Sequence, residues 1–243
     1  MMENKFIINL QKRADRIKKI KDNGYIKNYE IFQAIDGKKL NLDNNENLIY
    51  NNNNILLKKN MIDKIKGLKL GEVGCFISHY TVWKKVIKLN KNCLIFEDDV
   101  RVVKDFDDKL DSILQNELPK DFDLIWLGIR QSYVQNKFFK ERIEPNKNKI
   151  INNHFFHYIN PHRDTFYPYS YIISPKTCKF LCDKFENDNL KFPPVDHYMS
   201  SNLKNNYICI YNFNNPFLAS AEQGDTDIQS FNNESNNVYL QKN

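Results

Sequence analysis

The sequence predicts a single α/β domain, residues 1–243, with a mostly parallel central sheet flanked by helices. Apolar runs rich in β-branched residues alternate along the chain with segments whose apolar residues recur at helical spacing. The 243 residues, 41% of them hydrophobic and 13% aromatic, are enough to bury a substantial core. In such sheets ligands bind beyond the carboxyl ends of the strands, and one predicted strand ends in three consecutive acids.

Six short apolar runs predict the strands. The first run contains Ile7 and Ile8, and the third leads directly into the acids. The runs cover residues 5–10, 29–35, 93–96, 122–127, 169–174 and 207–211. The dipeptide Asp36-Gly37 after the second run is typical of a turn.

The spacing of apolar residues predicts helices between these strands. From Gly71 onward, apolar residues recur mostly three or four positions apart, which is the stripe of an amphipathic helix. The residues of this stripe are Val73, Phe76, Ile77, Tyr80, Trp83 and Ile87. Further helices are expected over residues 13–21, 106–115, 176–185 and 195–203. The asparagine-rich residues 41–60 predict a flexible loop or flap, and residues from 232 onward predict a polar tail.

Charge and cysteine content limit the function classes. The net charge of +6 comes from Lys and Arg spread along the chain, which predicts a solvated surface and no nucleic-acid partner. The five cysteines have neither zinc-ribbon spacing nor a CxxC motif, so we expect free thiols in a reducing compartment.

No signal peptide and no membrane-spanning run is apparent. We therefore expect a cytoplasmic protein, in the host-cell cytoplasm or the virion if its source is viral. The abundance of Asn, Lys and Ile is typical of an AT-rich genome, such as that of a large DNA virus or a low-GC bacterium.

The acids Glu97, Asp98 and Asp99 directly follow the apolar run 93–96. Three adjacent carboxylates repel one another and are costly to bury, so a cation is expected to compensate them. In an extended chain Glu97 and Asp99 project to one side, as a pair for Mg2+ or Mn2+. Asp98 then projects to the other side, toward the protein or the substrate. A charged strand end that caps a helix or faces water explains the same pattern equally well.

Several motifs closely resemble those of glycosyltransferase family 25, which contains lipooligosaccharide and procollagen galactosyltransferases. The most specific are Gly71-Glu72-Val73-Gly74-Cys75-Phe76-Ile77-Ser78-His79, followed by Trp83, and the acid-containing segment 94–100. The weaker matches occur in the order of the family: Ile8-Asn9-Leu10 with Arg13 and Asp15-Arg16, Ala34-Ile35-Asp36-Gly37, Trp126-Leu127-Gly128, residues 169–174 and Pro194-Val195-Asp196. The resemblance covers nearly the whole chain.

This resemblance implies a GT-A-like fold and the inverting transfer of galactose or glucose from a UDP-sugar to a hydroxyl acceptor. The acceptor is expected to be hydroxylysine of a collagen-like protein or a surface glycan. Glu97 and Asp99 are then expected to hold Mn2+ or Mg2+, and Asp98 to contact ribose or sugar. Asp196 is expected to be the base that deprotonates the acceptor. From spacing alone, Asp196 fits a helix N-cap instead.

Residues after the first strand are candidates for nucleotide binding. Asn9, Arg13 and Arg16 are expected to hold the uridine and its phosphates, because guanidinium groups suit diphosphate oxygens. Arg16 also fits a charge on a helix surface.

Two further groups of residues each have a functional and a structural interpretation. Ala34, Asp36 and Gly37 predict either a close approach of backbone to the base or ribose, or a plain turn. Glu72 and His79 lie two helical turns apart and can share a face beside the donor sugar. His79 also fits a core histidine whose hydrogen bonds are satisfied.

Two segments resemble peripheral parts of the family's site. Within residues 221–230, Gln223 and Asp225 are expected to add a last diphosphate or metal contact from a lid. Residues 131–163 form a long, basic insertion on the acceptor side. The aromatic residues that this region would present to a sugar or peptide are Phe155, Phe156, Tyr158 and Tyr167. Its three histidines, His154, His157 and His162, lack acid or cysteine partners at ligand spacing, so zinc is the weaker interpretation.

Two other function classes fit parts of the sequence. A noncatalytic paralogue that binds a nucleotide-sugar or a glycan would keep the fold without turnover. The presence of Glu97, Asp98 and Asp99 together with Asp196 argues against it. Nucleic-acid binding rests on the net charge alone.

Overall fold

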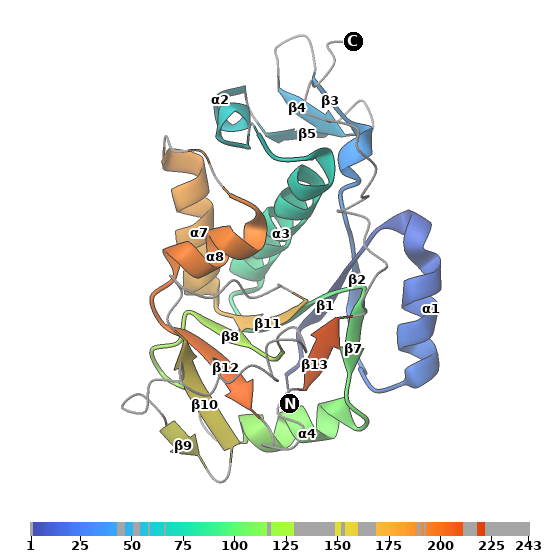
Figure 1. Ribbon diagram of the computed structural model, residues 1–243, viewed down its shortest axis with the longest axis vertical. Coiled ribbons are helices and arrows are strands. Elements are labelled where there is room, and N and C mark those ends of the chain that lie inside the picture. The colour runs from blue at the N-terminus through green and yellow to red at the C-terminus, as the bar shows by residue number, and fades with distance from the viewer. Residues whose placement is uncertain are drawn as a thin grey trace.

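The computed structural model describes residues 2–42, 47–50, 54–57, 59–65, 67–115, 118–128, 149–151, 154–159, 169–188, 191, 193–210 and 218–221. Its centre is an eight-stranded sheet with the strand order β2-β1-β6-β11-β8-β12-β10-β9 (Figure 1). These strands are β1 (Lys5–Asn9), β2 (Glu30–Gln33), β6 (Cys93–Glu97), β8 (Leu124–Trp126), β9 (Lys149–Ile151), β10 (His154–Ile159), β11 (Ser170–Ile173) and β12 (Asn206–Ile210).

Strand direction confirms the predicted class. β1 is parallel to β2 and β6, and β8 is parallel to β12. β10 and β11 are antiparallel to both of their neighbours, so six of the eight strands point the same way. The domain is therefore α/β, with a mostly parallel central sheet.

Helices cover both faces of this sheet (Figure 1). On one face lie α3 (Leu70–Leu89), α7 (Pro175–Asn187) and α8 (Val195–Asn202), and on the other lie α1 (Ala14–Asn23) and α4 (Phe106–Leu114). Successive strand residues point to opposite faces. Accordingly, Ile95 packs in the cluster with α3, whereas Leu94 and Phe96 pack in the cluster with α1 and α4.

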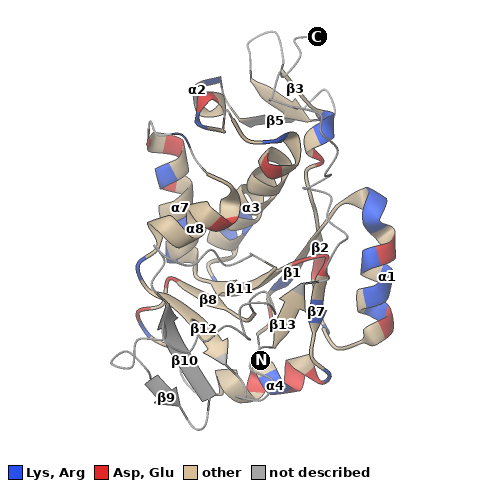
Figure 2. Ribbon diagram, viewed as in Figure 1, with Lys and Arg blue, Asp and Glu red and all other residues tan. Residues whose placement is uncertain are grey.

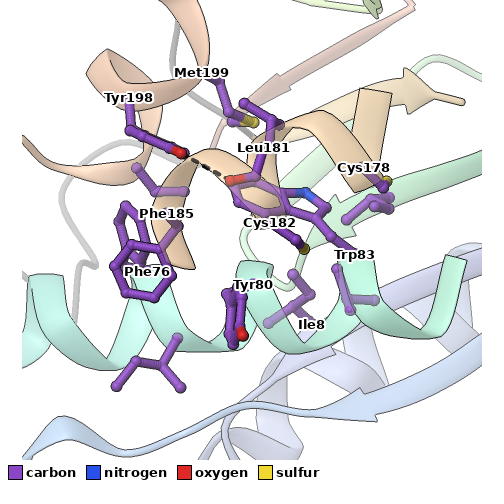
Figure 3. Packing of buried hydrophobic residues seen from close by; sticks show 14 of the residues in the cluster. Ile8, Phe76, Tyr80, Trp83, Cys178, Leu181, Cys182, Phe185, Tyr198 and Met199 are labelled. Atoms are coloured by element: carbon purple, nitrogen blue, oxygen red, sulfur yellow. Dashed lines mark hydrogen bonds between the residues drawn. The ribbon is translucent and has the colours of Figure 1, made fainter. Parts of the chain in front are cut away.

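Aromatic packing fixes the position of α3 against α7 and α8 (Figure 3). The ring of Phe76 lies 4.9 Å from that of Phe185 and 5.2 Å from that of Tyr198, measured between centroids. The Tyr198 hydroxyl donates a hydrogen bond of 2.8 Å to the Leu181 carbonyl, which ties α8 to α7. Since these side chains are fully buried, they hold α3 in one orientation toward the sheet.

Two regions differ from the expected loops. Within residues 41–60 the chain forms a small antiparallel sheet of β3 (Leu40–Leu42), β4 (Leu48–Tyr50) and β5 (Asn54–Leu57), followed by α2 (Lys59–Ile62). Alternation of side chains along β4 explains the difference. Leu48 of β4 is buried, and the two neighbouring strands, β3 and β5, each pair with β4. The described part of the insertion 131–163 likewise forms β9 and β10, which extend the main sheet.

The remaining short elements complete the chain. They are η1 (Gln11–Arg13), η2 (Gly37–Lys39), η3 (Asp63–Ile65), β7 (Val100–Val102) and β13 (Ala219–Ala221). β7 and β13 pair with each other although they lie far apart in sequence. Gly128 allows this pairing, because a Cβ atom there would lie 1.9 Å from the Ala219 carbonyl oxygen.

Charged residues lie mainly on the outer sides of the helices, as Figure 2 shows for α1. No helix in the described ranges is long and apolar enough to cross a membrane. All five cysteines are free, and four of them are buried.

A buried ion pair departs from this surface distribution and anchors β1. The Lys5 ammonium lies 2.7 Å from the Asp107 carboxylate of α4, and their side chains are only 3% and 10% exposed. Asp107 also accepts a hydrogen bond of 2.7 Å from the Lys27 backbone N–H. A buried carboxylate that loses its cation keeps the cost of desolvation without the compensating attraction.

We therefore predict that Lys5→Met destabilises the fold by about 3 kcal/mol, the cost typical of removing one partner of a buried pair. Chemical denaturation of the full chain measures this difference. The matched control is Lys91→Met, because Lys91 pairs with Glu3 where both side chains are well exposed. Its effect is expected to stay below about 1 kcal/mol. Equal losses in the two variants would contradict the prediction.

Candidate active site

Three chain segments end together at one edge of the central sheet. In the parallel pair of β1 and β6, Ile8 lies opposite Glu97, so both strands reach this edge at the same level. β2 ends there too, and the Ala34 N–H donates a 2.9 Å hydrogen bond to the Asn9 carbonyl. The acids that follow β6 therefore lie at the carboxyl ends of adjacent parallel strands, as the sequence predicted.

Asp98 faces the protein. Its buried carboxylate accepts a hydrogen bond of 2.7 Å from the Asn9 side-chain amide and forms an ion pair with Arg16 of α1. Burial raises the pKa of Asp98, and the Arg16 and Asn9 contacts oppose that rise. Of the two predicted directions for Asp98, the structure has the one toward the protein. Asn9 and Arg16 are thus engaged with Asp98.

In the described part of the chain, no Lys or Arg side chain forms an ion pair with Glu97 or Asp99, although the charge of Arg16 lowers the pKa of Asp99. Burial, reinforced by the neighbouring negative charge of Glu97, raises the pKa of Asp99 to about 7. The Oδ1 atom of Asp99 is buried and has no hydrogen-bond partner among the described residues. Carboxylate oxygens are the ligands that Mg2+ and Mn2+ prefer. The two carboxylates therefore fit the predicted divalent cation, which would supply the missing positive charge.

Helix α3 brings two more side chains to Glu97. The Cys75 Sγ atom lies 3.7 Å and the His79 Nε2 atom 3.2 Å from the same Glu97 oxygen, Oε1. The ligand atoms of Cys75, His79 and Glu97 all lie within 4.8 Å of one another. Burial and the nearby acids, Glu97 foremost, raise the pKa of the Cys75 thiol well above its usual value.

Cys75 belongs to the family motif of residues 71–79, but the sequence alone predicted for it only a free thiol and no role in the site. Its position one helical turn before His79 was the signal that could have identified it, because residues four apart share a helix face.

His79 is a core histidine with both ring nitrogens engaged. Its second nitrogen, Nδ1, lies 2.7 Å from the Tyr171 hydroxyl of β11. This fits the structural alternative for His79, and it places the ring between the core and the carboxylate of Glu97.

Asp196 lies in the first turn of α8, near Glu97. Pro194 occupies the N-cap position, and the Asp196 carboxylate accepts a hydrogen bond of 2.9 Å from the adjacent His197 N–H. Burial raises the pKa of Asp196; the His197 contacts oppose this, and the charge of Glu97 adds to it. Asp196 is therefore not the N-cap residue, and it is close enough to Glu97 for the two charges to interact.

The turn after β2 packs against the start of α3. A Cβ atom at Gly37 would lie 1.7 Å from the Leu70 carbonyl oxygen, so only glycine fits there. Asp36 caps η2 by accepting a hydrogen bond of 3.2 Å from the Lys38 N–H. At the same helix end, the Glu72 carboxylate accepts a hydrogen bond of 2.8 Å from the Lys69 N–H. These contacts support the structural alternative for the turn.

Other predicted residues lie at the margin or outside the described residues. Arg13 forms an ion pair of 3.1 Å with Asp15, whose side chain is about half exposed. Gln223, Asp225 and Tyr167 lie outside the described residues, as does His162.

Comparisons with known proteins place this site in context. The sequence profile of glycosyltransferase family 25 (LPS biosynthesis protein) matches residues 2–199. Procollagen galactosyltransferase 2 of Homo sapiens is 31% identical over 202 residues, which are 80% of this chain and 29% of that protein. Inactive glycosyltransferase 25 family member 3 of Homo sapiens is 34% identical over 133 residues, which are 52% of this chain and 22% of that protein.

The chain thus spans less than a third of the length of these curated relatives. Among solved structures, the galactosyltransferase LgtC in complex with donor and acceptor sugar analogs aligns over 94% of this chain and 92% of its own. The sequence identity is 11% and the TM-score 0.45. The family profile, which matches most of the chain and includes the acids, α3 and Asp196, identifies the chain as a member of glycosyltransferase family 25.

Proposed function

We propose that this protein is a metal-dependent, inverting hexosyltransferase that uses a UDP-sugar donor. One observation carries the proposal: Glu97 and Asp99 are interacting, partly buried carboxylates at the carboxyl end of β6, with Asp196 nearby and no Lys or Arg ion pair to either among the described residues. Membership in glycosyltransferase family 25 supports the reaction class. The name of the galactosyltransferase relative makes galactose the first donor sugar to test, ahead of glucose.

Each acid has a distinct role in this proposal. Glu97 and Asp99 hold Mn2+ or Mg2+, which when bound neutralises the negative charge of the leaving diphosphate. Arg16 already offsets the charge of Asp98 and Asn9 donates a hydrogen bond to it, so Asp98 does not add a further charge to the metal site. In this proposal the donor binds beside the group of hydrogen-bonded residues formed by Asn9, Arg16 and Asp98.

Asp196 is the proposed base. In an inverting displacement the acceptor oxygen attacks the anomeric carbon opposite the diphosphate, and its proton passes to a carboxylate on that side. Asp196 suits this task because burial and the charge of Glu97 raise the pKa of its carboxyl group and so increase its basicity. His197 beside it is exposed, and we assign it no proton-transfer role.

The acceptor is proposed by its chemistry as a primary or secondary hydroxyl group. Hydroxylysine of a collagen-like protein follows from the name of the procollagen galactosyltransferase relative, and a surface glycan from the family description. The reducing compartment expected from the free cysteines makes the cytoplasm the proposed location, in which either acceptor would be modified.

The first test measures hydrolysis and transfer from a panel of UDP-sugars with Mn2+ present or chelated. We expect turnover of one sugar that is lost on chelation. Asp99→Asn is expected to lower turnover on the order of 100-fold or more, since losing even an outer partner of a metal ligand costs about 10- to 100-fold. Asp183→Asn is the control, because Asp183 is an exposed partner of Lys179 on α7. Full turnover of Asp99→Asn in chelator would refute metal dependence.

A second test separates the base from the donor site. Asp196→Asn keeps the size of the side chain but cannot accept the proton, so kcat should fall about 10²- to 10⁴-fold. Binding of the UDP-sugar, measured by calorimetry, should not change. His197→Gln serves as the neighbouring control and should retain turnover.

Retained transfer by Asp196→Asn would remove Asp196 from the base role. A wild-type protein that binds a UDP-sugar but transfers it to no acceptor would instead support the noncatalytic alternative, for which the relative named as inactive is a precedent.

A further inference from the structure

A chain of buried hydrogen bonds connects the core of the domain to Glu97. Trp83 of α3 donates from Nε1 to the Tyr171 hydroxyl over 3.1 Å. The Tyr171 hydroxyl lies 2.7 Å from His79 Nδ1, and His79 Nε2 lies 3.2 Å from Glu97 Oε1. Trp83, Tyr171 and His79 are each fully buried, so water does not compete for these bonds.

For a neutral imidazole beside an ionised Glu97, the donors and acceptors in this chain can be assigned in only one way, because the carboxylate only accepts and His79 Nε2 must then carry the ring hydrogen. An indole N–H is a donor only, so the Tyr171 oxygen accepts from Trp83. The Tyr171 hydrogen is then available to His79 Nδ1, which leaves the ring hydrogen on Nε2, directed at Glu97. Burial raises the pKa of Tyr171 well above its usual value, so the hydroxyl keeps the hydrogen that it donates.

Both α3 side chains therefore donate to one oxygen of Glu97. The Cys75 thiol, 3.7 Å from Oε1, has a weak hydrogen to donate, and the His79 N–H donates to the same atom. With Oε1 occupied in this way, the other oxygen, Oε2, would be the one available to a cation.

We propose that Tyr171 is a positioning residue for Glu97. It acts through His79, whose tautomer it selects, so that the carboxylate of Glu97 is held with Oε2 available to a divalent cation. This inference rests on the proposed role of Glu97 as a metal ligand. A group that hydrogen-bonds directly to a metal ligand, as His79 would if Glu97 binds the metal, contributes about 10- to 100-fold in metal affinity.

Tyr171→Phe removes the hydroxyl and keeps the ring, which packs on His79 at 5.7 Å and on Trp126 at 5.9 Å between centroids. We expect the variant to bind Mn2+ about tenfold more weakly in the absence of any sugar nucleotide. The loss of the free Mn2+ signal in electron paramagnetic resonance measures this affinity directly. Tyr80→Phe is the matched control, because Tyr80 is buried in the same core but its hydroxyl donates to Glu186, away from the site.

A double-mutant cycle tests the route through His79. In His79→Gln the side-chain amide can still donate to Glu97 but no longer depends on Tyr171, so adding Tyr171→Phe should cause no further loss of Mn2+ affinity. A purely structural effect of Tyr171→Phe would persist in the His79→Gln background. Circular dichroism of each variant establishes that it is folded.

Each result bears on the proposal. Unchanged Mn2+ affinity in Tyr171→Phe, or an equal loss in the His79→Gln background, would overturn the positioning role while leaving the proposed function intact. A wild-type protein that binds no Mn2+ would overturn both.

Loading with Co2+ tests whether Cys75 is a metal ligand or a hydrogen-bond donor. A thiolate-to-cobalt absorption band that is lost in Cys75→Ser would make Cys75 a ligand and overturn its assignment as a donor to Glu97.

Discussion

Repulsion among the three carboxylates that end β6 is the constraint around which the rest of the site is arranged. Adjacent anions in a partly buried position are unstable unless each is compensated. β6 ends at Glu97, and Asp98 and Asp99 lie in the turn that follows it. Within that turn Asp98 contacts Arg16 and Asn9, so the protein itself compensates this acid. Burial and the charge of Glu97 raise the pKa of Asp99 to about 7, although the charge of Arg16 opposes that rise. The fold thus compensates one acid internally, and the proposed metal ion would compensate the other two.

The two hydrophobic layers determine how precisely these acids are held. On the α3 side, Phe76 and Trp83 pack among α7 and α8, and the same helix carries Cys75 and His79 to Glu97. On the other side, α1 brings Arg16 to Asp98, and Ile17 and Ile20 bury that helix against the sheet. A shift of either helix would therefore change the hydrogen bonds of the acids. Close packing, which resists such shifts, contributes to the site as well as to stability.

The sequence predicted the elements whose signal is local. The helical stripe that contains Val73 and Trp83, and the apolar run before Glu97, each specify an element from consecutive residues, and both occur as predicted. The extended chain predicted for the three acids ends at Glu97, because Asp98 and Asp99 form the turn before β7, so strand period does not explain their directions. β7 and β13 were missed because each is only three residues long and exists by pairing with a distant partner. Tyr171 was read only as part of a strand, since its contact with His79 depends on how β11, β6 and α3 are placed together.

The free-energy cost of desolvating two neighbouring anions also distinguishes a metal centre from a simple sugar-binding surface. Hydroxyl groups of a sugar can donate hydrogen bonds to Glu97 and Asp99, but they bring no positive charge to offset the desolvation of two neighbouring anions. A divalent cation offsets both the desolvation and the repulsion, and it adds affinity for the negative diphosphate of a donor. Among the described residues, the Oδ1 atom of Asp99 has no hydrogen-bond partner, and His79 orients Glu97. Both features favour binding of a cation, whereas a carbohydrate alone would gain little from either. The physical arrangement of this site therefore supports the proposed metal site over a surface that binds a carbohydrate alone.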